Sequence, residues 1–223
     1  MKPQDAKFPN TSFFTNAGRL AALAAGMLLA TCMASAAVIT TMTVSGGTGF
    51  SAETAPDRLI GPGITASGDV TTWTHTNTSW PSDVHWLTVF GSDSWVEFDL
   101  GGTYTVGTAH IWNFNTSEAD RAARSASTVR LIFSENSTFG DADDSFQDLS
   151  LSPGTGLTTY TGEHIALTQV SDVTNIRLEI LTNGGNTFAA MSEVRFSAIP
   201  EPSSFALVAG MFGLTCVRRR RRG

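Results

Sequence analysis

The four histidines, His75, His85, His110 and His164, are the first residues that could do chemistry. Histidine binds zinc or acts as a general base only when other ligands or a nucleophile lie within reach, as in the H-E-x-x-H motif. None of the four belongs to that motif or to a pair spaced to bind zinc from one element. We therefore expect structural or surface histidines.

Nucleophiles and carboxylates give no better case for catalysis. The sequence contains no G-x-S-x-G elbow for a nucleophilic serine. Glycoside hydrolysis needs two placed carboxylates, and 18 acidic residues between Glu53 and Glu193 single out no pair. Residues 141–144, DADD, lack the glycine and glutamate of an EF-hand, so we expect a solvated turn there. We predict no catalytic residues and no enzyme.

The tryptophans are more informative, because all five fall within 40 consecutive residues. Trp95 and Trp112 lie in alternating segments and are expected in the core. Trp73, Trp80 and Trp86 lie in TTWTHTNTSWPSDVHWL, which is too polar and too interrupted by proline for a regular strand. An aromatic side chain in a long loop either pins the loop to the fold or offers a flat face to a sugar ring. Both roles stay open.

The elements that must position these residues are predicted to be strands. Residues 95–100, 129–131, 176–180 and 194–196 alternate apolar and polar side chains, as half-buried strands do, between glycine-rich turns. Residues 118–127 are expected to form a loop with at most one helical turn. The pattern predicts an all-β, two-sheet jelly-roll β-sandwich over residues 37–198.

The N-terminal residues carry the features of a secretory signal peptide. Three basic residues precede the apolar run 20–30, and the small residues Ala34-Ser-Ala36 follow it. We predict a signal helix over residues 1–36, cleaved after Ala36. A buried N-terminal helix is the alternative, and a lipoprotein-like box at residues 29–32 fits poorly because Thr31 precedes Cys32.

Cysteine and charge distributions agree with an exported domain. Both cysteines, Cys32 and Cys216, lie in the terminal segments, so residues 37–198 form no disulfide. Those residues hold six arginines against 18 acidic residues. Such an acidic surface excludes nucleic-acid binding and attraction to anionic lipid.

The C-terminus combines Pro200-Glu201-Pro202, an apolar run from Phe205 to Val217, and a basic cluster: Arg218, Arg219, Arg220, Arg221 and Arg222. Thirteen apolar residues make about 20 Å of helix at ~1.5 Å per residue, whereas a bilayer core is about 30 Å thick. The run is marginal as a permanent anchor. The arginines fit the positive-inside rule, with the domain outside.

Three stretches resemble the discoidin, or coagulation factor five/eight type C, domain of the galactose-binding-like superfamily. They are WVEFDLG with YTV (residues 95–106), HIWNFN with Arg124 and VRLIFS (residues 110–134), and IRLEILTN with MSEVRF (residues 176–196). The resemblance implies an eight-stranded jelly roll with ligand loops at one end. Because the sugar-contacting residues vary between members, we choose candidates from exposed-loop chemistry: Trp73, His75, Trp80 and Arg124.

The same resemblance implies one structural calcium, held by a D-G-S-G loop and by a glutamate near the last strand. Glu193 matches that glutamate, but Ile60 stands where the loop aspartate is expected. An aliphatic side chain cannot ligate a hard cation. Asp57 or Asp69 could compensate; alternatively, Glu193 pairs with an arginine and no calcium binds.

The C-terminal stretch resembles the PEP-CTERM sorting signal. The resemblance implies export from an exopolysaccharide-producing bacterium, transient anchoring in the inner membrane, and cleavage near residues 200–202 by an exosortase. We therefore expect a non-catalytic cell-surface or extracellular-matrix protein that binds glycan, its exopolysaccharide being the expected ligand. The alternative is a structural or adhesive matrix protein that makes protein contacts without a sugar pocket.

Overall fold

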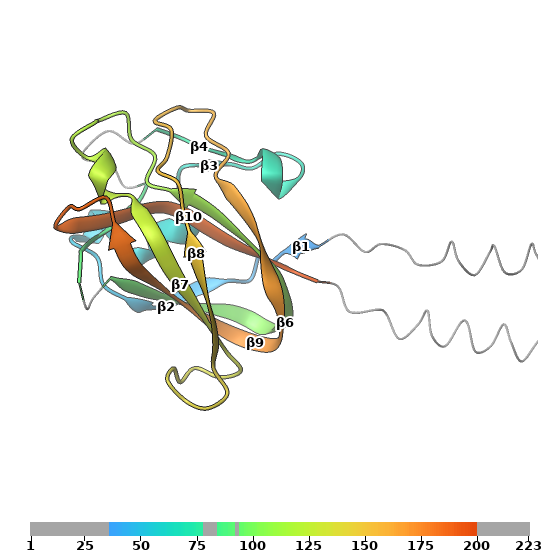
Figure 1. Cartoon of the computed structure of the whole chain (residues 1–223). Coiled ribbons are helices and arrows are strands. Elements are labelled where there is room, and N and C mark those ends of the chain that lie inside the picture. The colour runs from blue at the N-terminus through green and yellow to red at the C-terminus, as the bar shows by residue number, and fades with distance from the viewer. Residues whose placement is uncertain (1–35, 78–83, 92–93, 200–223) are drawn as a thin grey trace, which may run out of the picture. The chain divides into compact units, whose positions relative to one another are not determined.

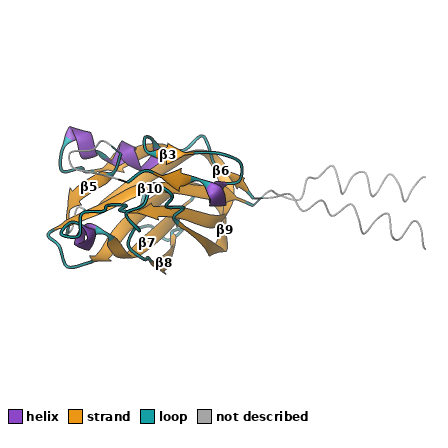
Figure 2. Cartoon of the chain, turned by 90° about the horizontal axis from the view of Figure 1, so that it is seen from above, coloured by secondary structure: helices purple, strands orange, loops and turns teal. Residues whose placement is uncertain are grey.

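The computed structural model describes residues 36–77, 84–91 and 94–199 of the chain (Figure 1). Figure 2 shows that strands make up the body of the domain and that short 3₁₀-helices lie in the connections. No helix in these ranges is both long and apolar enough to cross a bilayer. The elements are β1 (Ala37–Val38), β2 (Thr43–Gly47), η1 (Ala52–Thr54), η2 (Pro56–Ile60), β3 (Ile64–Thr65), η3 (Val70–Thr72), β4 (Thr74–His75), β5 (Trp86–Val89), β6 (Trp95–Asn113), η4 (Ala122–Arg124), β7 (Ala126–Ser134), β8 (Ser145–Ser150), β9 (Glu163–Asn183) and β10 (Phe188–Ala198).

The long strands β6 and β9 form a bent antiparallel ribbon. They pair from Trp95 opposite Glu179 at one end to Ile111 opposite Glu163 at the other. Their register shifts in the middle, between Asp99 and Thr108 of β6. Figure 1 shows the two strands running side by side.

The bend has a backbone cause. Gly101 in β6 has a φ of 72°, and Asp172 in β9 has a φ of 60°, so both adopt the left-handed conformation in the irregular middle of the ribbon. Glycine reaches this region without steric cost, and aspartate is among the residues that tolerate it. A Cβ on Gly101 would lie 2.8 Å from the Cβ of Thr41, so the position is also crowded.

The bent ribbon contributes to two layers. Its first part pairs with β2 through β6 and with β7 through β9, and β7 pairs in turn with β8. Its second part pairs through β6 with β10, which also carries β1 and β5. All these pairings are antiparallel, and β3 and β4 form a separate small sheet. The predicted all-β sandwich is confirmed.

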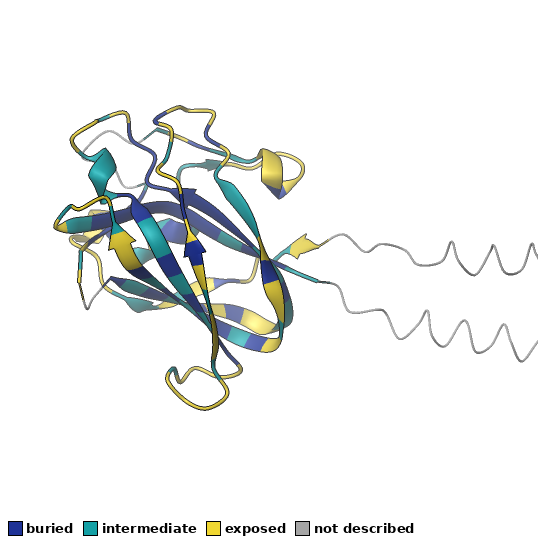
Figure 3. Cartoon of the chain, viewed as in Figure 1, coloured by how far each residue is buried: buried dark blue, intermediate teal, exposed yellow. Residues whose placement is uncertain are grey.

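The core follows the predicted alternation. Val96, Phe98 and Leu100 of β6 are fully buried, whereas Asp99 between them is exposed. In Figure 3 most of β10 is buried and the β7–β8 loop is exposed. The prediction was wrong for Trp86, which begins β5 rather than lying in an irregular loop. Its indole is fully buried, and Nε1 donates to the carbonyl of Thr48 at 2.7 Å.

The first and last described strands meet at one edge of the sandwich, because Ala37 of β1 pairs with Ala198 of β10. The predicted signal helix with Ala34, the motif Pro200-Glu201-Pro202, the C-terminal apolar run and the arginines Arg218 to Arg222 lie outside the described residues. Ala36, the residue expected before the cut, directly precedes β1.

Three of the four histidines are buried structural residues. His110 bonds through Nε2 to Ser197 Oγ (2.7 Å) and through Nδ1 to Nδ1 of His164 (2.9 Å). Burial lowers the pKa of both His85 and His110 to about 4, and nearby positive charge adds to the effect. At neutral pH these side chains are therefore neutral in the native state.

We predict that acid destabilises the wild-type protein more than an H110Q variant. Between pH 6.5 and 4 the unfolded chain binds a proton at residue 110 that the native state does not, so stability is lost as the pH falls. From pH 7 to pH 5 the difference amounts to about 2 kcal/mol of unfolding free energy. Urea unfolding of both proteins at the two pH values measures it. Parallel losses in the two proteins would contradict the assignment.

Candidate functional site

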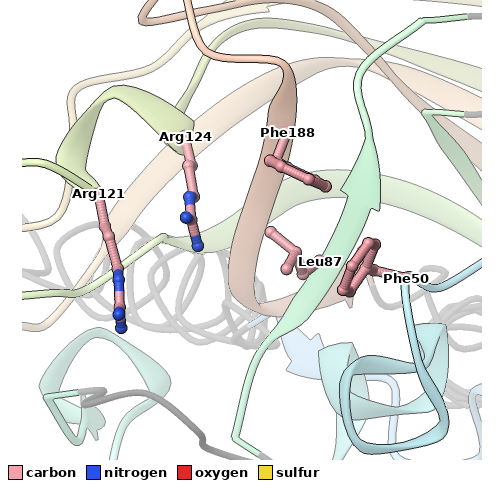
Figure 4. A pocket seen from close by; sticks show the side chains of 5 residues that line it. All are labelled: Phe50, Leu87, Arg121, Arg124 and Phe188. Atoms are coloured by element: carbon pink, nitrogen blue, oxygen red, sulfur yellow. The ribbon is translucent and has the colours of Figure 1, made fainter.

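A pocket of about 190 Å³ lies between loops that are far apart in the sequence. Its lining residues come from the β2–η1 loop, from β5, from the segment around η4 and from the start of β10: Phe50, Leu87, Arg121, Arg124 and Phe188. Figure 4 shows the two arginines on one side and the three apolar side chains on the other.

Two phenylalanines form the apolar side of the pocket. Phe50 is 51% exposed, and its ring meets the half-buried ring of Phe188 edge to face, with centroids 5.2 Å apart. Leu87 is buried beneath them. The backbone amide of Phe50 donates to the carbonyl of Leu87 at 2.7 Å, which fixes the β2–η1 loop against β5. This backbone hydrogen bond thereby holds the exposed side chain of Phe50 at the pocket.

The polar side is positioned by the β9–β10 turn. Asn183 donates through Nδ2 to the carbonyls of Asn186 and Phe188, both at 2.8 Å, and so closes the turn. Gly184 packs against η4 so closely that a Cβ there would lie 2.7 Å from the Cα of Ala123. This contact places the guanidinium carbon of Arg124 5.5 Å from the centre of the Phe188 ring.

The two arginines differ in their electrostatic partners. Arg121 forms an ion pair with Glu118 at 2.6 Å. No carboxylate of the described residues lies within 4.0 Å of Arg124, and its buried Nε has no hydrogen-bond partner among them. The pKa of Arg124 is lowered, first by burial and then by the positive charge of Arg121. Arg124 therefore brings to the pocket a cation that forms no ion pair with a described residue.

Buried amides fix the neighbouring loops. Asn115 donates through Nδ2 to the carbonyls of His75, Thr76 and Leu157 at 2.8–3.1 Å and accepts from the amide of Gly156 at 2.8 Å. Asn113 likewise donates to the carbonyls of Ala126 and Ser152. The HIWNFN motif thus supplies the side chains that anchor the loops, a role that its sequence pattern did not reveal.

Of the three predicted sugar-binding residues that the structure describes, only Arg124 lines the pocket. Trp73 packs against Val70, Trp112 and Tyr160, and its carbonyl accepts from Trp112 Nε1 at 3.2 Å. The choice of His75 as an exposed loop residue was wrong. That side chain is fully buried, and a Cβ on Gly63 would lie 2.5 Å from its Nε2. Trp80 lies outside the described residues.

Four lining residues were missed by sequence reasoning: Phe50, Leu87, Arg121 and Phe188. Each belongs to a different local pattern, and none of those patterns points to a ligand. One sequence feature could have pointed to the pocket: the aromatic residue Phe188 directly follows the turn sequence NGGNT at residues 183–187.

Glu193, the predicted calcium ligand, is paired with an arginine. Its carboxylate is fully buried, with Oε1 2.5 Å from Nη2 of Arg195, two residues along β10 on the same face. The same Nη2 donates to the carbonyl of Ile60 at 2.8 Å. Burial raises the pKa of Glu193, whereas the adjacent positive charge of Arg195 lowers it and favours the ionised carboxylate. The guanidinium thus bridges the two positions between which the family's calcium was expected.

These residues do not fit a calcium ion, which takes six to eight oxygen ligands. Asp57 is exposed beside Arg58, and Asp69 accepts from the amide and hydroxyl of Thr71 at the start of η3. Within the described ranges no three His, Cys, Asp or Glu side chains are grouped to hold a metal. The positive charge beside Glu193 comes from Arg195.

We predict that R195M destabilises the domain strongly while a chelator leaves it unaffected. Removing Arg195 leaves the carboxyl group of Glu193 buried without its counter-ion and costs about 3 kcal/mol of unfolding free energy. The double variant E193Q/R195M should recover part of this loss, because no buried charge remains. Urea unfolding measures all three proteins. A lower melting temperature of the wild type in EDTA would show instead that a bound metal stabilises it.

No protein-family model matches the chain, and no curated protein matches it. Among solved structures, a SusE-like protein aligns with a TM-score of 0.50 at 16% identity, covering 71% of this chain and 97% of its own. An F5/8 type C domain from Bacteroides fragilis aligns at 0.49 and 13% identity, over 75% and 97% of the two chains. A family 32 carbohydrate-binding module from Clostridium perfringens, solved with galactose, aligns at 0.46 and 13% identity, over 73% and 97%.

A family 89 glycoside hydrolase from Clostridium perfringens also aligns, with a TM-score of 0.45 and 18% identity over 73% of this chain. The chain spans only 14% of that enzyme. At such identities the likeness to the SusE-like protein concerns the fold alone. The chain adopts a β-sandwich of the kind found in that protein.

Proposed function

We propose that this chain is an exported, non-catalytic cell-surface or extracellular-matrix protein that binds glycan through the pocket between β5, η4 and β10. Its ligand in this proposal is exopolysaccharide. The C-terminus is processed by an exosortase after transient anchoring in the inner membrane. In this proposal the chain combines a glycan-binding domain with a C-terminal sorting signal.

The observation that carries the proposal is the pairing of one exposed and one half-buried aromatic ring with guanidinium donors in one small pocket. The C–H groups of a sugar pack on the faces of Phe50 and Phe188, and the hydroxyl groups accept hydrogen bonds from Arg121 and Arg124. A volume of about 190 Å³ suits one sugar ring, since pockets for drug-sized ligands are about 300–1,000 Å³.

The lining also supports a binding role rather than a catalytic one. The five lining residues that the structure describes are two phenylalanines, a leucine and two arginines. None of these side chains is a carboxylic acid, a histidine or a nucleophile, which are the groups that glycoside cleavage requires. The resemblance of residues 95–196 to discoidin-type domains points in the same direction.

We predict that F188A weakens polysaccharide binding about tenfold, and that F50A has a smaller effect in the same direction. The loss of a stacking ring removes about 1 kcal/mol or more of contact energy. Affinity electrophoresis of residues 37–199 in gels containing each of a panel of neutral and acidic polysaccharides measures the change.

The matched control is F146A, because Phe146 is 61% exposed on β8, away from the pocket, and also carries a cation–π contact, with Arg130. Binding by F146A should equal that of the wild type. If no polysaccharide in the panel retards the wild-type protein, glycan binding is excluded and the protein-contact alternative takes its place.

We predict that deletion of residues 200–202 leaves full-length protein in the membrane fraction. We expect the processing enzyme to recognise Pro200-Glu201-Pro202. Without this motif the enzyme does not cleave the chain, and the apolar run therefore stays attached. Mass measurement of the C-terminal peptide from the native cell reports the processing site.

The matched control replaces Ser203 and Ser204 with alanine directly after the motif, and it should be processed normally. Normal processing of the deletion variant would show that the C-terminal segment acts as an ordinary tail anchor.

A further inference from the structure

We infer that the pocket is selective for a sugar that carries a carboxylate, that is, a uronic acid unit. This inference rests on the proposed glycan-binding function and names its ligand class. The inference follows from the ion pairs that the arginines of the domain form, and from the position of Arg124, which forms none among the described residues.

Five of the six arginines in residues 37–198 have a carboxylate within 4.0 Å: Arg58, Arg121, Arg130, Arg177 and Arg195. Arg124 has none among the described residues, although the domain carries 18 acidic residues. An arginine with no counter-ion among the described residues is available to an anion from outside. That arginine lies in the pocket.

The surroundings of Arg124 increase the need for an anion. Its guanidinium carbon lies 5.5 Å from the centre of the Phe188 ring, and its buried Nε donates to no described residue. Leaving a buried N–H group of a guanidinium without an acceptor is unfavourable, although the rest of the Arg124 side chain is partly exposed. A carboxylate in the pocket would supply both the missing charge and an acceptor.

The geometry of guanidinium favours a carboxylate over a hydroxyl group. Its planar array of N–H donors matches the two oxygens of a carboxylate, and the resulting charge-assisted bonds are about twice as strong as neutral ones. Arg121 lies beside Arg124 in the pocket and adds positive charge, although it is paired with Glu118. The rings of Phe50 and Phe188 are left to contact the sugar itself.

The acidic domain limits how such a ligand can bind. Its overall field repels a long polyanion, but charges separated by more than about 8 Å are largely screened at physiological salt. The contact at Arg124 is short-range, and the pocket is small. We therefore expect one uronic acid unit, such as a chain end, to occupy the pocket, rather than a long tract of polymer on the surface.

The test compares polymers that differ only in the carboxyl group. Residues 37–199 are run by affinity electrophoresis in gels containing polygalacturonate or alginate, and in gels containing the carboxyl-reduced form of each. Wild-type protein should be retarded at least tenfold more strongly by an acidic form than by its reduced counterpart. Free galacturonate should compete for binding, and galactose should not.

Variants then assign the preference to Arg124. R124Q should lose the preference for the acidic form by roughly 10- to 100-fold, while R124K, which keeps the charge but not the planar fork, should lie between it and the wild type. R130Q removes an exposed arginine that pairs with Asp148 on the β7–β8 surface, and it should bind as the wild type does. Melting temperatures show whether each variant is folded.

The outcomes separate this inference from the proposed function. Equal retardation by acidic and carboxyl-reduced polymers, or an unchanged preference in folded R124Q, would overturn the uronic acid assignment and leave glycan binding in place. No retardation by any acidic or neutral polysaccharide would overturn both. If R124Q does not fold, the comparison of polymers with wild-type protein and with R124K decides the assignment.

Discussion

The bend in the β6–β9 ribbon is the constraint on which the rest of the structure depends. One antiparallel pair runs through both layers, so each layer's position is fixed by the same two strands. The bend requires left-handed backbone at Gly101 and Asp172 and a shifted register between them. Because both layers contain this ribbon, the free edges of β6 and β9 determine where the neighbouring strands β2, β7 and β10 pair.

The ribbon also determines where loops gather. The strand β6 ends at Asn113, and Asn115 lies two residues further on, so two buried amides lie where the strand enters the loop region. Each amide satisfies several backbone groups that water cannot reach, which makes the loops as fixed as the strands. The pocket itself is held by the side-chain amide of Asn183, by the backbone hydrogen bond from Phe50 to Leu87, and by the close approach of Gly184 to Ala123.

The arginines of the domain differ in their partners, because five form ion pairs and Arg124 forms none among the described residues. Arg195 joins the buried Glu193 to the carbonyl of Ile60, and so ties η2 to β10. Arg177 pairs with Glu97 across β6 and β9. Arg124 makes no such pair among the described residues. The same residue type thus stabilises the scaffold where a carboxylate lies within reach, and in our proposal it binds the ligand at Arg124.

The sequence by itself determined the strands, because an alternating pattern such as that of residues 95–100 or 176–180 reports burial locally. It also determined the acidic surface and identified one pocket residue, Arg124. Only the tertiary structure decided that Phe50, Leu87, Arg121 and Phe188 join it, since these residues meet through loop closures spanning more than a hundred positions. The same reason explains the errors at His75 and Trp86. The polar composition of their segment suggests exposed side chains. Their burial depends on residues distant in sequence that pack against the segment, and a local sequence pattern does not report those contacts.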